Sequence, residues 1–270
     1  MRKKWKGLNL SFMSKIKESE RRNRSNIVLA LDLVSDQSKF LMSKSAEILD
    51  KVHPYICALK VNHHLVLPLS LFGGVKKIVE KAHKFKLPAI MDCKINDVGS
   101  TNRIIAENYF RAGFDAVIAN PFVGWEEGLQ PVFEVAEQME RGVLLLVYMS
   151  HKASHEGYGQ SIYDPSTGRN KPQYVIFAEK ALSWKAGGAI VGATYPDKIK
   201  EVYAVLKDKI PIYSPGIGVQ GGDLEAAVTS GAHYLIVGRS IIHADKPDEA
   251  AKTIRDLAAK FLKQRWSSRP

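Results

Sequence analysis

The feature that most constrains the fold is a regular alternation of short β-branched apolar runs with longer segments of helical periodicity, which begins after Asn26. Segments such as 40–52, 74–85, 102–112 and 247–261 are typical of helices. Strands that are apolar on both faces and separated by helices indicate a parallel sheet covered by helices. The short runs predict eight strands, at residues 27–32, 55–61, 89–94, 116–120, 143–149, 188–191, 212–214 and 234–237.

Eight strand–helix units in about 245 residues match the length of a (β/α)8 barrel, so we expect a single α/β domain of this class. A doubly wound open sheet is the alternative. We expect the barrel at residues 26–262, after a basic extension at 1–25 and before a C-terminal tail at 263–270. No uninterrupted apolar run reaches the ~18 residues that a transmembrane helix needs, so no membrane-spanning segment is expected.

The basic charge of the chain is concentrated at its start. The formal net charge is +11, and residues 1–24 contain nine Lys or Arg against Glu18 and Glu20, which leaves only +4 for the rest. The extension is interpreted as a solvated tail or a short helix packed under the first strand. Nucleic-acid binding is the less favoured alternative, in which removal of residues 1–24 would abolish binding and leave any catalysis intact.

Cysteine and histidine placement argues against a metal site. Cys57 and Cys93 are too few for a disulfide framework or a four-ligand zinc site, and they indicate a reducing, cytoplasmic setting. His151 and His155 have the i, i+4 spacing of helical metal ligands but fall in a predicted loop without a third ligand. We therefore expect no metal.

Charged residues gather where the first three strands end. Asp32 and Lys60 lie at the ends of the first two strands, and the third ends in D-C-K-I-N-D with Asp92, Lys94 and Asp97. Side chains alternate along a strand, so those of Asp92 and Lys94 share a face and the residue between them points the other way. The predicted outcome is an alternating row of charges, Lys–Asp–Lys–Asp, at the C-terminal mouth of the barrel. A buried ion-pair network is a weak device for stability, so this position favours catalysis.

Glycine-rich segments after the last two strands predict a phosphate site. The seventh strand runs into S-P-G-I-G-V-Q-G-G-D, which contains Gln220, and the eighth runs into V-G-R-S-I with Gly238 and Arg239. Glycines let backbone N–H groups approach an anion, and arginine binds phosphate oxygens in a fork. A phosphate site between these two loops recurs in this architecture. The substrate is therefore expected to carry a phosphate monoester.

The segment 150–173 makes the connection after the fifth strand longer than the others by a dozen residues or more. Long connections in compact domains are usually functional or disordered, and this one falls on the active-site face of a barrel. We expect a loop that covers the substrate.

Several reaction classes lack their usual motifs. The chain has no dinucleotide-binding fingerprint after its first strand, no Walker loop and no G-x-S-x-G. Lys60 or Lys94 could form a Schiff base, but a carboxylate beside each would hold the lysine protonated and oppose nucleophilic use.

Six motifs in order, spanning about residues 26 to 260, resemble the orotidine 5′-monophosphate decarboxylase family. They are L-A-L-D, L-K-V, D-C-K-I-N-D-V-G-S-T, M-S-H, S-P-G-I-G-V-Q-G-G and V-G-R-S-I. The resemblance implies a TIM barrel that converts orotidine 5′-monophosphate (OMP) to uridine 5′-monophosphate (UMP) and CO₂ in pyrimidine biosynthesis. It also implies no metal or organic cofactor, and a homodimer with active sites at the interface.

The resemblance also implies roles for individual residues. Lys60, Asp92, Lys94 and Asp97 of the partner subunit would form the catalytic group, and Lys94 would protonate C6 of the pyrimidine. The residues implied in substrate binding are Asp32, Lys60 and the partner's Thr101 for the ribose, Ser150 and Pro215 for the base, and Gln220, Gly238 and Arg239 for the phosphate.

Two positions depart from the family pattern. Gly99 stands where proline is usual, and Asn62 stands where many members have glycine. Glycine after the aspartate is also common in the related 3-keto-gulonate 6-phosphate decarboxylases and hexulose phosphate synthases, which use Mg²⁺. A sugar-phosphate decarboxylase or aldolase-type lyase is therefore the alternative. OMP decarboxylation is favoured because Thr101, Gln220 and the S-P-G segment fit it better.

Overall fold

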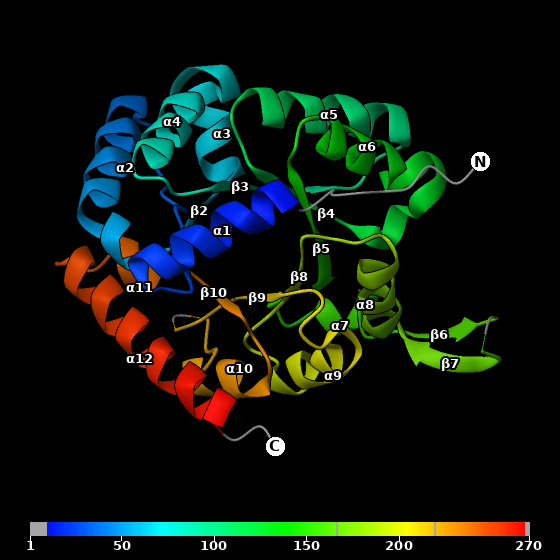
Figure 1. Ribbon diagram of the computed structural model, residues 1–270. Helices are drawn as coiled ribbons and strands as arrows, with labels where there is room; N and C mark the ends of the chain where they lie inside the picture. Colours follow the sequence, from blue (N-terminus) through cyan, green and yellow to red (C-terminus); the bar gives the residue numbers. More distant parts are fainter. Residues whose placement is uncertain (1–9, 166, 219, 268–270) are drawn as a thin grey trace.

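Eight parallel strands form a closed barrel in the computed structural model, which describes residues 10–165, 167–218 and 220–267. The strands follow one another around the barrel in chain order, and β10 pairs with β1 to close it (Figure 1). The (β/α)8 prediction is confirmed, and the open-sheet alternative is wrong. The strands are β1 (Ile27–Ala30), β2 (Ala58–Asn62), β3 (Ala89–Ile95), β4 (Ala116–Ala119), β5 (Gly142–Tyr148), β8 (Gly188–Val191), β9 (Ile212–Pro215) and β10 (Tyr234–Val237).

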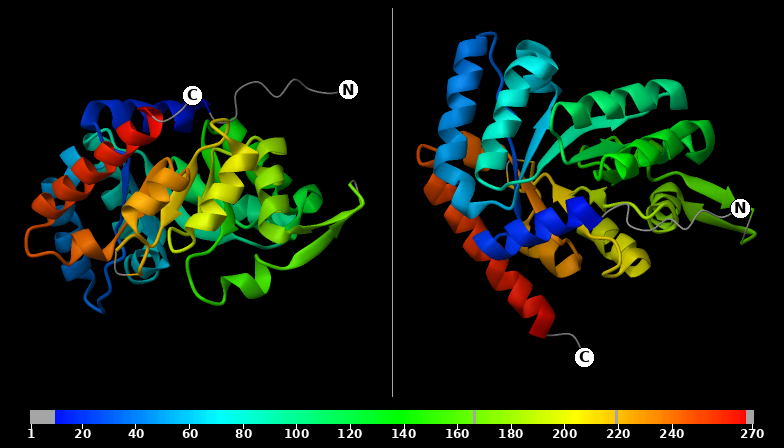
Figure 2. Two further views of the ribbon diagram at one scale, coloured as in Figure 1. Left: turned by 90° about the horizontal axis from the view of Figure 1, so that it is seen from below. Right: turned by 45° about the horizontal axis from the view of Figure 1, so that its top comes forward.

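Helices surround the barrel on the outside (Figure 2). Every residue of β5 is buried, as expected for a strand with the interior on one face and helices on the other. The helical segments after β1 to β4 are α2 (Ser38–Val52), η1 (His53–Tyr55), α3 (His63–Leu69), η2 (Ser70–Val75), α4 (Lys76–Lys84), α5 (Gly99–Arg111), η3 (Pro121–Val123), η4 (Trp125–Leu129) and α6 (Gln130–Gln138). Those after β5 to β10 are α7 (Ser154–Gly157), α8 (Gln173–Ser183), α9 (Pro196–Leu206), α10 (Leu224–Ser230), α11 (Arg239–Ile242) and α12 (Pro247–Ser267).

The N-terminal helix α1 (Leu10–Asn23) lies across the N-terminal end of the barrel (Figure 1). Phe12 and Ile16 are fully buried in the main core. Gly142 makes room for this helix, because a Cβ there would come within 2.7 Å of the Phe12 ring. Of the two interpretations of the extension, the packed helix is therefore the one observed, and residues 1–9 lie outside the described residues.

A buried carboxylate joins α1 to the barrel. Asp115, just before β4, is 1% exposed, and its Oδ1 accepts hydrogen bonds from Lys15 of α1 at 2.7 Å and from Arg141 at 2.8 Å. Its Oδ2 accepts the backbone N–H of Ala89 at 2.9 Å and lies 2.8 Å from His83 Nε2. Burial alone would raise the pKa of Asp115, but these partners outweigh it and lower the pKa to about 2.

The segment 150–173 has more structure than a loop. It contains α7 and an antiparallel hairpin of β6 (Ser161–Asp164) and β7 (Arg169–Pro172), which extends away from the barrel (Figure 1). Among its described residues, Ser150 alone lines the main cavity. The segment is therefore partly helix and hairpin instead of a plain loop, and its covering of the substrate stays a prediction.

The C-terminal helix is longer than expected. Helix α12 continues to Ser267, past residue 262 where we expected the barrel to end. Arg265 is buried and donates to the carbonyl of Ala232 at 2.9 Å, so the start of the predicted tail packs on the barrel. None of the described helices is long and apolar enough to cross a membrane.

Candidate active site

A cavity of about 510 Å³ opens at the C-terminal ends of the barrel strands. Such strand ends carry the active sites of barrel enzymes. The cavity brings together nine residues that the sequence singled out, from six different strands or the loops that follow them. They are Asp32, Lys60, Asp92, Lys94, Ser150, Pro215, Gln220, Gly238 and Arg239.

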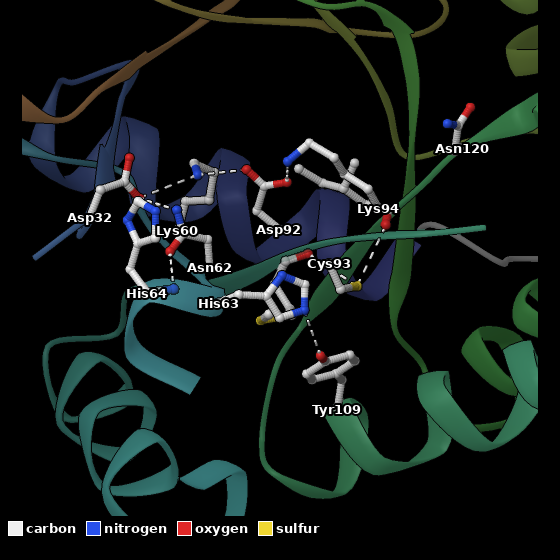
Figure 3. Close-up of polar contacts among 12 residues, drawn as sticks. Asp32, Lys60, Asn62, His63, His64, Asp92, Cys93, Lys94, Tyr109 and Asn120 are labelled. Carbon is white, nitrogen blue, oxygen red and sulfur yellow. Dashed lines mark hydrogen bonds and ion pairs between the residues drawn. The ribbon is translucent and has the colours of Figure 1, made fainter. Parts of the chain in front are cut away.

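Four of these residues form an alternating row of charges (Figure 3). The Nζ of Lys60 lies 2.8 Å from Asp92 Oδ2 and 3.7 Å from Asp32 Oδ1. The Nζ of Lys94 lies 2.6 Å from Asp92 Oδ1. Within one chain the row therefore runs Asp32, Lys60, Asp92, Lys94. Asp92 accepts a hydrogen bond from a lysine on each of its oxygens.

The row holds Asp92 and Lys60 ionised. Burial would raise the pKa of Asp92, but the ammonium groups of Lys60 and Lys94 outweigh it and lower the pKa to about 2. Burial would lower the pKa of Lys60, which is 4% exposed, but the carboxylates of Asp92 and Asp32 raise it above its ordinary value. A protonated Lys60 is a poor nucleophile, which agrees with the argument against a Schiff base.

The backbone at Lys94 departs from a regular strand. Lys94 has φ +49°, and the pairing of β3 with β4 shifts register between Met91 and Ile95. A left-handed residue that is not glycine is uncommon, and such strain gathers at functional sites. The thiol of Cys93 points to the other side, 3.6 Å from the carbonyl oxygen of Ile118, and burial raises its pKa to about 12. The regular alternation of side chains along a strand predicted that Lys94 and Cys93 point to opposite sides. It did not predict the register shift, a β-bulge, between Met91 and Ile95.

Two of the predicted site residues lie outside the cavity. Asp97 is exposed in the turn after β3, and its Oδ1 accepts the backbone N–H of Val98 at 2.7 Å. Thr101 is half-buried in the first turn of α5. Neither residue lines the cavity of its own chain.

The predicted phosphate end of the cavity is built from tight turns. Gly216, Gly218 and Gly221 have φ values of +97°, +79° and +87°, a region that favours glycine. The hydroxyl of Ser150 donates to Gln220 Oε1 at 3.0 Å, which joins the end of β5 to this loop. Gly238 packs closely on β1, because a Cβ there would lie 3.3 Å from atoms of Ala30.

Asn62, at the end of β2, is a functional candidate that was not predicted from the sequence. Asn62 lines the cavity and donates from Nδ2 to Asp32 Oδ1 at 2.8 Å. Its Oδ1 accepts the backbone N–H of His64 at 2.8 Å, which caps α3. The alternation of side chains along a strand could have indicated Asn62, because residues 60 and 62 point to the same face. His64 and His243 also line the cavity.

Comparison with known proteins identifies the family. The model of the orotidine 5′-phosphate decarboxylase / HUMPS family matches residues 25–254. The chain belongs to this family. Relatives named orotidine 5′-phosphate decarboxylase include one from Methanosarcina acetivorans, 34% identical over 230 residues that cover 85% of this chain and 93% of the relative. Another, from Pyrococcus furiosus, is 35% identical over 243 residues, 90% of this chain and 100% of the relative.

Solved structures of the orotidine 5′-phosphate decarboxylase family share this barrel. The orotidine 5′-phosphate decarboxylase of Pyrococcus horikoshii OT3 has a TM-score of 0.69 and 33% identity, covering 86% of this chain and 98% of that one. A Toxoplasma gondii structure described as a putative orotidine-monophosphate-decarboxylase has a TM-score of 0.81 at 21% identity, covering 94% and 97% of the two chains. The second likeness concerns the fold alone. The family resemblance drawn from the motifs is confirmed.

Proposed function

We propose that this member of the orotidine 5′-phosphate decarboxylase family converts OMP to UMP and CO₂, the last step of pyrimidine biosynthesis, without a cofactor. The observation that carries the proposal is the row in which Asp92 lies between Lys60 and Lys94, inside a cavity that is also lined by Gln220 and Arg239. The row of charges and the loops predicted to bind phosphate thus line the same cavity.

The row suits a reaction that leaves a carbanion. Loss of CO₂ from C6 of the pyrimidine leaves an electron pair in the plane of the ring, where the π-system cannot accept it. Fixed charge must then stabilise the transition state. The ammonium group of Lys94 faces the developing negative charge and then donates a proton to C6.

Asp92 contributes through its charge. Its carboxylate lies where the carboxylate of OMP must sit, so the departure of CO₂ relieves the repulsion between two negative groups. A pair of unit charges about 4 Å apart is worth about 4 kcal/mol at an effective dielectric of 20, so one pair supplies only part of the barrier reduction. Phosphate binding far from C6 supplies more by holding the ring in place.

The remaining cavity residues bind the substrate. Asp32 and Lys60 accept and donate hydrogen bonds at the ribose hydroxyls, and Ser150 and Pro215 contact the base. Backbone N–H groups and the arginine fork bind phosphate oxygens strongly because these hydrogen bonds are charge-assisted. The residues assigned to the phosphate are Gln220, Gly238 and Arg239.

The active enzyme is a cytoplasmic homodimer in this proposal, and Asp97 and Thr101 complete the site of the partner subunit. Asp97 lies outside the cavity of its own chain. Two large apolar side chains near it in sequence are exposed, Val98 at 63% and Ile104 at 59%, and an apolar surface of this kind suits contact with another subunit.

An ultraviolet assay tests the reaction. Purified protein is mixed with OMP and excess chelator, and the loss of orotate-type absorbance is followed. We expect full activity with chelator. The related Mg²⁺-dependent sugar-phosphate lyases are the second candidate, because the matching family model covers both groups. Indifference to OMP, with turnover of a sugar phosphate only when Mg²⁺ is present, would establish that candidate instead.

Subunit complementation tests the shared site. Lys94→Ala and Asp97→Ala chains are co-expressed with different affinity tags, and heterodimers are isolated by two successive affinity steps. Each homodimer should be nearly inactive, whereas the heterodimer has one site with both Lys94 and Asp97 and should show about half of the wild-type activity. An inactive heterodimer would contradict the shared site.

A further inference from the structure

The turn that carries Asp97 is held by one buried side chain. Asn102, in the first turns of α5, has no exposed surface. Its Oδ1 accepts the backbone N–H of Asp97 at 3.0 Å, and its Nδ2 donates to the carbonyl oxygen of the same residue. Both backbone polar groups of residue 97 are therefore bound by a single amide.

The same amide reaches a third segment. Nδ2 of Asn102 also donates to the carbonyl oxygen of Gly128 at 3.0 Å, at the end of the kinked segment η4. Helix α5 and this segment are in close contact, because a Cβ on Gly99 would lie 2.7 Å from the carbonyl oxygen of Glu127. The end of β3, the start of α5 and η4 thus meet at Asn102.

The chemistry of this contact requires an amide. One N–H and two carbonyl oxygens face the side chain, and asparagine supplies one acceptor and two donors in a single planar group. A carboxylate of the same shape would keep the acceptor but would face two carbonyl oxygens without a proton to donate. Because the group is buried, water cannot replace the lost hydrogen bonds.

We infer that Asn102 is a positioning residue for the neighbouring active site: it fixes the backbone of Asp97 and thereby places the carboxylate that Asp97 presents to the partner subunit. The carboxylate itself is exposed, so Asn102 holds the backbone of Asp97 without contacting its functional group. This inference rests on the proposed function, since it requires that Asp97 act in the partner's site.

Heterodimers separate this role from a merely structural one. Asn102→Asp should lower kcat/KM of the homodimer by about 100-fold, the loss expected for a displacement of about 1 Å in a catalytic group. Paired with Lys94→Ala, the Asn102→Asp chain supplies an intact Lys94 while the Lys94→Ala chain supplies a correctly held Asp97. This heterodimer should regain about half of the wild-type activity. Paired with Asp97→Ala, the same chain should stay at the low level.

The controls separate failure of the inference from failure of the proposed function. Suppose that the heterodimer of Lys94→Ala with Asp97→Ala regains activity but the heterodimer of Lys94→Ala with Asn102→Asp does not. Asn102 then supports the active site of its own chain, and the inference is overturned. If neither pair regains activity, the shared site itself is wrong. Asn108→Asp is the matched control on the same helix, since its amide donates to Ile104 O at 2.9 Å, and it should keep normal activity.

A second substitution tests the inference if the Asn102→Asp chain does not fold. Asn102→Ser keeps a hydroxyl one bond short of the amide atoms, which can make only part of the hydrogen bonds of Asn102, and it should show a loss of activity with the same rescue in the heterodimer. Normal kcat/KM in both homodimers would overturn the inference. Failure of both chains to fold, judged by circular dichroism, would also overturn it, because the amide would then support the whole fold and not the placement of Asp97.

Discussion

The ammonium group of Lys94 lies 2.6 Å from the carboxylate of Asp92, two positions earlier on the same strand. The backbone of Lys94 is left-handed. In a regular strand, side chains two positions apart stand side by side about 6 to 7 Å apart. The lysine side chain spans this distance, and the register shift with its left-handed backbone falls on the same residue. The end of β3 is thus irregular at Lys94, the residue proposed to donate the proton.

Lys94→Ala should abolish turnover while leaving the fold intact. It removes both the cation that faces the developing carbanion and the proton donor, so kcat should fall by at least about 1,000-fold. The ultraviolet assay measures kcat, and circular dichroism with thermal unfolding checks the fold. Activity within tenfold of the wild-type value would contradict the assigned role.

Arg239→Ala should act mainly on substrate binding. It removes charge-assisted hydrogen bonds to phosphate, worth about 1.5 to 3 kcal/mol each, so kcat/KM for OMP should fall by about 100-fold. Orotidine, which lacks the phosphate, provides the control: the variant and the wild-type protein should process it equally slowly. A loss of the same size on both substrates would place Arg239 elsewhere in the mechanism.

Asp115→Asn should destabilise the protein without changing the chemistry. The substitution leaves Lys15, His83 and Arg141 without their buried carboxylate, and the free energy of unfolding should fall by about 3 kcal/mol. Urea denaturation measures the change. Lys15→Ala is the matched comparison and should cost less than about 1 kcal/mol, because Lys15 is half exposed. In folded protein at 25 °C, kcat should stay unchanged in both variants.

The same carboxylate predicts how stability depends on pH. The pKa of Asp115 is about 2 in the folded protein, below its ordinary value of 3.8. A depressed pKa stabilises the folded state above the unfolded value and loses that contribution as the pH falls through the folded one. Between pH 5 and pH 2 the wild-type protein should therefore lose about 2 kcal/mol more stability than Asp115→Asn. Parallel pH curves for the two proteins would contradict this assignment.

The barrel was predictable from the sequence because its strands bury both faces. Such strands appear as short continuous apolar runs, and the predicted bounds of β8 and β10 coincide with the observed ones. Most of the charged row was predictable for a related reason, although Asp32 stands at its end within one chain, where Asp97 was expected. Strand ends in a barrel converge, so Asp32, Lys60 and Asp92 had to meet once their strands were neighbours.

Features that depend on contacts distant in sequence were not predictable. The bulge at Lys94 has no signature in D-C-K-I-N-D, since its backbone is set by the pairing of β3 with β4. The polar hairpin within 150–173 lacks the alternating apolar pattern of a half-buried strand, so it was expected to be a loop. The roles of Asp97 and Thr101 depend on a second subunit and stay predictions.

Helix α1 covers one end of the barrel, and this bears on how substrate and products enter and leave the cavity as well as on stability. Among the described residues, Phe12 and Ile16 are buried at that end, and the cavity opens at the rim that carries Arg239. In the proposed reaction, OMP, CO₂ and UMP therefore all pass this rim. Under the proposed phosphate assignment, CO₂ leaves past a nucleotide whose phosphate is still held by Gln220 and Arg239, so the product nucleotide leaves after the gas.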